Sequence, residues 1–182
     1  MISLFDVMAA FGGGVLASAI GALPAFIFAG LLVVANLTDL AFGPLFGPHI
    51  AFAGAVAATA FAAKRGLESG KDILAPLIKM NDGTVLLVGG IFGAFGMIVQ
   101  KYLASIKTPT DTVALTVVIT CVAARLIFGN RRLFSKYIVP DGKTSWTLIM
   151  FGLGVGLISG YVAIVTKNPV LAFGVAAVLL LV

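Results

Sequence analysis

The chain of 182 residues contains few charged side chains, since Asp, Glu, Lys and Arg together make up only 10% of it. Soluble globular proteins carry about 25% charged residues, so this composition excludes that class. Hydrophobic residues make up 60% of the chain, and its mean hydropathy is +1.15. They fall in long blocks with the charged residues between them. This pattern predicts an all-α integral membrane protein that forms a single transmembrane domain over residues 1–182.

Cysteine and histidine occur once each, as Cys121 and His49. A single cysteine excludes an internal disulfide, and one histidine beside one aspartate falls short of a closed zinc site. The sequence also lacks a Walker loop, an HExxH motif and the TVGYG filter of potassium channels. We therefore expect no enzymatic activity, no bound metal and no cofactor.

Basic residues outnumber acidic ones, giving a formal charge of +5. In so apolar a chain this excess indicates cytoplasmic loops of a membrane protein, and we expect no nucleic-acid partner. The first hydrophobic block contains Asp6 and no basic residue, unlike the positive start of a signal peptide. We therefore expect this block to be a membrane span of the mature protein.

Six membrane spans are expected, and they cover residues 4–22, 25–42, 48–65, 84–104, 112–128 and 146–166. A short amphipathic segment at 72–80 is expected to lie in the membrane interface. The last hydrophobic block, 170–182, corresponds to roughly 20 Å of helix, which is too short for a hydrocarbon core of about 30 Å. We expect this block to be a half-span or a truncated helix.

The distribution of Lys and Arg predicts the topology. The loops after the first, third and fifth spans share one face, with Lys64, Arg65, Lys71, Lys79, Arg125, Arg131, Arg132, Lys136 and Lys143 on or near it. The opposite face has Lys101, Lys107 and Lys167. Because basic loops stay in the cytoplasm, loops 64–83 and 130–145 are predicted to be cytoplasmic and the N-terminus external. The expected location is the plasma membrane.

The sequence also indicates an internal repeat. Four short matches occur in the same order in residues 1–75 and 84–172, among them the pairs Gly13-Gly14 with Gly89-Gly90 and Phe52-Ala53-Gly54 with Phe151-Gly152-Leu153. Each unit contains three spans, an odd number, so the second unit is expected to insert inverted relative to the first. Coincidence between apolar segments is the alternative interpretation.

Two Gly-Pro steps precede His49, at Gly43-Pro44 and Gly47-Pro48. Proline favours the first turn of a helix, so a helix is predicted to begin at Pro48, after a hinge over 43–47. His49 is interpreted first as a residue that packs or caps at this helix start. Contact with a substrate or a gate is the second interpretation, and a metal ligand the third.

Polar side chains near span ends are further candidates for a solute pathway. Asn36 and Asp39 lie near the end of the second span, and Arg125 lies near the end of the fifth. An ionisable residue close to a span is a functional candidate, and its alternative is an interfacial charge that orients the helix. Asn36 can instead form a hydrogen bond between helices.

Small residues recur every four positions in two spans, at Gly89 and Gly93 and at Gly152, Gly156 and Gly160. Such spacing lets helix backbones approach closely, so these residues are predicted to pack helices within one protomer or between protomers. A homo-oligomer in the lipid bilayer is therefore expected.

These observations favour a channel or secondary transporter for a small solute or ion, with its pathway between the two inverted repeats. The alternative is a non-transporting membrane subunit or scaffold that assembles with a partner. The two differ in one property, because transport requires a continuous polar path, whereas a scaffold can pack dry throughout.

Overall fold

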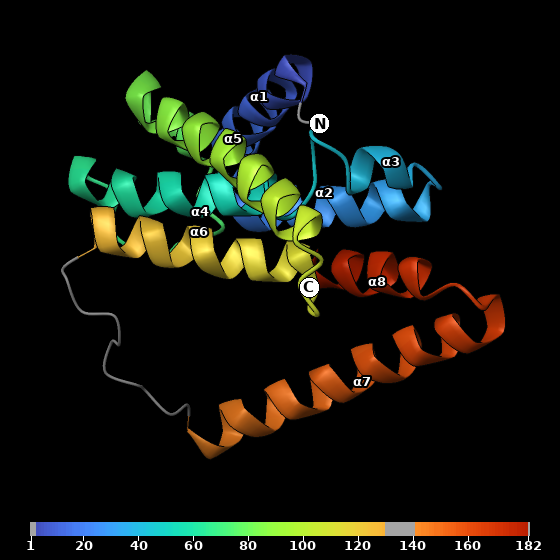
Figure 1. The fold of residues 1–182 in the computed structure, drawn as a ribbon. Helices are drawn as coiled ribbons and strands as arrows, with labels where there is room; N and C mark the ends of the chain where they lie inside the picture. The colour runs from blue at the N-terminus through green and yellow to red at the C-terminus, as the bar shows by residue number, and fades with distance from the viewer. Residues whose placement is uncertain (1–2, 130–140, 182) are drawn as a thin grey trace.

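A computed structural model describes residues 3–129 and 141–181 (Figure 1). Its helices are α1 (Leu4–Ile20), α2 (Ala22–Val34), α3 (Thr38–Ala41), α4 (Ala51–Ala62), α5 (Gly83–Ser105), α6 (Thr112–Phe128), α7 (Gly142–Thr166) and α8 (Pro169–Val178). Short 3-10 helices cover Ala63–Arg65, Leu77–Met80 and Leu179–Leu181. The described residues contain no strand, so the all-α prediction is confirmed.

Two of the described helices, α5 and α7, are long and apolar enough to cross a membrane. A third span is possible if α1 and α2 together form one broken span, because they are bent by 118° at a short break. The remaining apolar helices α6 and α8 are shorter. The structure thus contains two or three helices able to cross a membrane, and the six predicted spans are not confirmed.

Two predicted helix boundaries are wrong. The span expected over 25–42 ends at Val34, where the N–H groups of Asn36 and Leu37 bond back to the carbonyls of Val33 and Leu32. Asn36 has a φ of +62°, a left-handed conformation that asparagine tolerates at helix ends. The helix expected at Pro48 begins at Ala51 instead. A separate turn precedes it, closed by the Ile50 N–H on the Gly47 carbonyl at 2.8 Å.

Helix α4 lies at the centre of the fold and packs against α1, α2, α5 and α6. Most of its residues are small, and Ala53, Ala55, Ala57 and Ala58 are completely buried. Glycines bring the neighbouring backbones into contact with it. A Cβ added to Gly54 would lie 2.6 Å from the Gly89 carbonyl oxygen and 3.2 Å from the Gly14 Cα. The crossing of α1, α4 and α5 therefore depends on the absence of side chains.

Helix α7 has the opposite environment, because none of its 25 residues is buried. Figure 1 shows it on the far side of the molecule from α1, and it packs on α8. In the predicted repeat α4 and α7 correspond, yet they differ in length and burial. The inverted repeat, with units 1–75 and 84–172, stays a prediction.

The segment between α4 and α5 reaches into the body of the protein. The Ile73 carbonyl accepts a hydrogen bond from the Leu23 N–H at 2.9 Å, next to the break between α1 and α2. Leu77 is buried among Ala58, Ala62 and Val85. Leu77 therefore contributes to the core, whereas Asp72, Leu74, Ile78 and Lys79 are exposed, and the expectation that 72–80 lies in the interface stays a prediction.

Candidate functional site

A cavity of about 1000 Å³ lies between the second halves of α4 and α6 and the segment that follows α4. Three cationic side chains and one anionic side chain line it: Lys64, Lys71, Arg125 and Glu68. We call it the basic cavity. Its remaining wall is largely apolar and includes Phe52, Val56, Ile73, Val122 and the half-buried Cys121.

A second cavity of about 770 Å³ lies among α2, α8 and the first residues of α4 and α6. Four phenylalanine rings contribute to its wall, and the ring of Phe173 lies 5.6 Å from that of Phe26 and 5.3 Å from that of Phe42. Asp111 is its one charged lining residue. We call it the aromatic cavity.

The two cavities share Phe52 and Ile73. Phe52 comes from the start of α4, and its ring packs edge-on against that of Phe26 at 5.8 Å. Ile73 comes from the segment after α4, which the Leu23 N–H holds in place. These two half-buried side chains therefore form the boundary between a cavity at one end of α6 and a cavity at the other.

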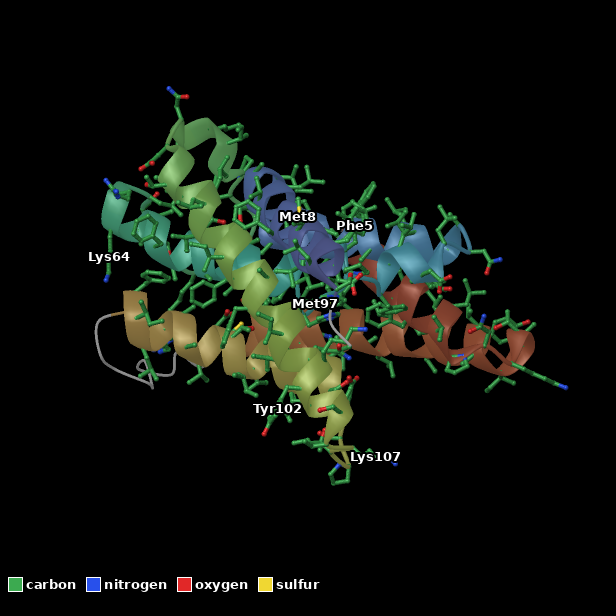
Figure 2. The ribbon with its side chains drawn as sticks, turned by 45° about the horizontal axis from the view of Figure 1, so that its top comes forward. Phe5, Met8, Lys64, Met97, Tyr102 and Lys107 are labelled. Atoms are coloured by element: carbon green, nitrogen blue, oxygen red, sulfur yellow. The ribbon has the colours of Figure 1, made fainter. Side chains whose placement is uncertain are left out.

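The ends of three helices meet beside the basic cavity. The Lys64 ammonium donates to the Ile127 carbonyl at 3.4 Å, which joins the ends of α4 and α6. The Arg65 guanidinium lies 3.9 Å from the Asp82 carboxylate at the start of α5. At the other end of α5, Gln100 donates to Thr112 at 3.2 Å. Figure 2 shows Lys64 at the left edge of the molecule and Lys107 at its lower edge.

Asp82 is the N-cap of α5, where its carboxylate accepts a hydrogen bond from the Thr84 N–H at 2.9 Å and another from the Thr84 hydroxyl at 2.6 Å. These bonds, with a smaller contribution from Arg65, hold the pKa of the carboxyl below its ordinary value. Asp82 therefore remains ionised and fixes the start of α5 beside this group of basic residues.

His49 lies in the turn before α4 and outside the lining of both cavities. Its side chain is only 3% exposed, and its Nδ1 has no hydrogen-bond partner among the described residues. Its carbonyl oxygen lies against Gly96, and its ring lies against Gly47. This position matches packing at the start of the helix more closely than direct contact with a solute in either cavity.

The other predicted pathway residues are divided between the cavities and the surface. Asn36 and Asp39 are exposed and line neither cavity. Arg125 lines the basic cavity, and Pro48 lines the aromatic cavity. Gly43, Pro44 and Gly47 belong to the turns before α4, where a Cβ on Gly43 would collide with the Asp39 carbonyl. The structure brings only Arg125 and Pro48 to a cavity wall.

The predicted packing glycines also divide into two groups. A Cβ on Gly93 would lie 2.5 Å from the Ala10 carbonyl oxygen, and one on Gly89 would collide with Ser18. Gly152, Gly156 and Gly160 on α7 have no described atom within 4 Å of the position of such a Cβ. The first group forms contacts within the protomer, and the second group has space for a partner.

Phe52, Ile73 and Lys71 were not predicted as site residues. The sequence indicated Phe52 only as part of the repeat, and Lys71 chiefly as one of the basic residues. Ile73 lies in a segment expected at the interface, so no local pattern indicated that it would meet Phe52. Their proximity depends on the tertiary fold. Residues 130–140 of the predicted cytoplasmic loop, including Arg131, Arg132 and Lys136, lie outside the described residues.

The described side chains do not bring three or more His, Cys, Asp or Glu residues together in a way that could hold a metal ion. The family model described as "Family of unknown function (DUF7973)" matches residues 35–137, which is more than half of the chain. The matched range includes α3 to α6, the turn at His49 and both residues of the shared boundary. No curated protein and no solved structure matches the chain.

Proposed function

We propose that this chain, which belongs to the family of unknown function DUF7973, is a membrane channel or secondary transporter for a small solute or ion. The observation that supports this proposal most is that the basic and aromatic cavities meet at Phe52 and Ile73. Together they extend along both halves of α6. Movement of two side chains would join them into one path between the ends of this helix.

The geometry around this boundary favours a path more than a packed scaffold. Helix α4 has only 12 residues, about 18 Å of helix, and it is followed by an irregular segment that contains Ile73. Irregular backbone at membrane depth is tolerated where it is buried in protein or lines a cavity. Ile73 meets this condition, because it lines both cavities and accepts a hydrogen bond from Leu23.

We further propose six membrane-crossing segments, of which those around α2 and α4 are broken or short and are surrounded by protein. Inverted three-span units and assembly into a homo-oligomer in the plasma membrane remain part of this proposal. The meeting of Lys64, Arg65 and Arg125 at the ends of α4 and α6 supports a cytoplasmic position for that end. The N-terminus is then external.

Solute flux into liposomes tests the transport proposal. Purified wild-type protein is compared with Phe52→Ala, which removes a ring from the boundary, and with Phe5→Ala, which removes a ring that is 78% exposed on α1. We expect protein-dependent flux of small ions or solutes that increases several-fold in Phe52→Ala and is unchanged in Phe5→Ala. Folded protein that transports none of a broad panel, in any of these forms, would contradict the proposal.

A second candidate function, a membrane subunit that assembles with another protein, is favoured by α7. This helix is apolar and unburied, and its glycine-spaced face has no described neighbour within 4 Å of the three glycines. Gly156→Ile would weaken assembly with a partner helix and leave a purely lipid-covered helix unchanged. Loss of co-purifying protein in this variant, without any flux in the wild type, would favour the subunit.

A further inference from the structure

The rim of the basic cavity carries a net positive charge. Among the described lining residues, Lys64, Lys71 and Arg125 supply three positive charges and Glu68 one negative charge, a formal charge of +2 for this described part. The charged ends belong to three different segments: the end of α4, the segment that follows it, and the end of α6. A cation-rich rim of this kind favours anions over neutral or cationic solutes.

Part of this positive charge stabilises the protein itself. The Lys64 ammonium donates to the Ile127 carbonyl and lies 5.8 Å from the centre of the Phe128 ring. Basic residues commonly offset the negative end of a helix in this way. Lys71 belongs to the segment between α4 and α5 and lines the same cavity.

Below this rim the wall is apolar. Phe52, Val56 and Val122 lie on it, and the cavity volume of about 1000 Å³ is at the upper end of the range for small-molecule sites. A charged rim above an apolar wall matches a solute that has an anionic group at one end and a hydrophobic body at the other. Charge attraction is also stronger beside such a wall than in open water.

We propose that the basic cavity binds a small organic anion from the aqueous phase, with its carboxylate among Lys64, Lys71 and Arg125. Its apolar body then lies against Phe52 and Val56. This inference rests on the proposed transport function, because it names the class of solute that enters the path at this end.

Cys121 provides a direct test, because it is the only cysteine of the chain and it lines the same cavity. The rate at which a maleimide labels Cys121 is measured in the presence of benzoate, and of benzamide, which has the same shape without the charge. We expect benzoate to slow the labelling and benzamide to leave it unchanged. Equal protection by both, protection by neither, or no labelling of Cys121 in the folded protein would overturn the inference.

Charge variants locate the binding. Lys71→Gln should raise the benzoate concentration that gives half protection about two- to five-fold, as expected for loss of one solvent-exposed charge partner. Lys79→Gln removes another exposed charge, outside the cavity lining, and should change nothing, and Lys71→Arg should retain protection. Identical effects of Lys71→Gln and Lys79→Gln would contradict a site at the rim.

Two further measurements identify the source of the anion and separate anion binding from transport. Slower labelling in phosphatidylglycerol than in phosphatidylcholine, with no effect of benzoate in either, would assign the cavity to a lipid headgroup and overturn the inference. Protection by benzoate without solute flux would retain the anion site and reject transport. Flux of other solutes without protection by benzoate would retain the transport proposal and reject the anion site.

Discussion

The crossing of α1, α4 and α5 predicts a large difference between two glycines of the same helix. Gly12 and Gly14 are both interior residues of α1, two positions apart. A Cβ on Gly12 would have no neighbour within 4 Å. A Cβ on Gly14 would collide with the Gly89 carbonyl oxygen and lie 2.9 Å from the carbonyl carbon and 3.2 Å from the Gly90 Cα. All these neighbours are backbone atoms, which cannot rotate away.

The magnitude follows from comparing Gly12→Ala with Gly14→Ala. Each change favours the helix by up to about 1 kcal/mol, because alanine has the higher helix propensity. Only Gly14→Ala also forces two backbones apart, and such overpacking costs about 1–3 kcal/mol. Subtracting one variant from the other removes the propensity effect. We therefore expect Gly14→Ala to be less stable than Gly12→Ala by about 1–3 kcal/mol.

Thermal unfolding in detergent, followed by the loss of the helical circular dichroism signal, measures this difference. For a chain of this length it corresponds to a gap of about 2–12 °C between the two midpoints. Gly12→Ala should unfold at or above the temperature of the wild type, and Gly14→Ala below it. If both variants unfold at the same temperature, the close approach of α1 to α5 is wrong.

Two further predictions concern the helix caps Asp111 and Asp82. Asp111 accepts hydrogen bonds from the Val113 N–H at 2.8 Å and the Ala114 N–H at 3.2 Å. Asp111→Ala should therefore lower the free energy of unfolding, measured with denaturant, by about 1 kcal/mol, and Asp111→Asn should lower it much less. Equal losses would contradict the cap. The pKa of Asp82 is lowered in the folded protein by its bonds from Thr84, so it contributes stability above the pKa of the unfolded carboxyl and loses that contribution as the pH falls through its folded pKa. Unfolding of Asp82→Asn should therefore depend less on pH below about 5 than unfolding of the wild type, and parallel pH profiles would refute this role.

The sequence predicted the helices that local pattern determines. The segment expected at 112–128 is α6 residue for residue, and the one expected at 84–104 differs from α5 by one residue at each end. Both are largely apolar segments with polar residues on each side, so the positions where the helices begin and end are visible in the sequence. The prediction that the whole protein is helical depends on composition alone.

Features that depend on contacts between distant segments could not be predicted in this way. Leu77 packs against α4 and α5, and the Ile73 carbonyl accepts a hydrogen bond from the Leu23 N–H, and neither contact is visible in the local sequence pattern. The same applies to the site. Phe52 and Ile73 form the boundary between the cavities, but they are 21 positions apart and neither is polar. The sequence therefore does not indicate them as pathway residues.

Passage of solute through the basic cavity can be measured in the native sequence, because Cys121 lines this cavity. Flux into liposomes is recorded before and after a bulky maleimide reacts with the wild type and with Cys121→Ser, which has no thiol. We predict that the adduct stops flux through the wild type and leaves flux through Cys121→Ser unchanged. Undiminished flux through fully labelled wild-type protein would place the pathway elsewhere.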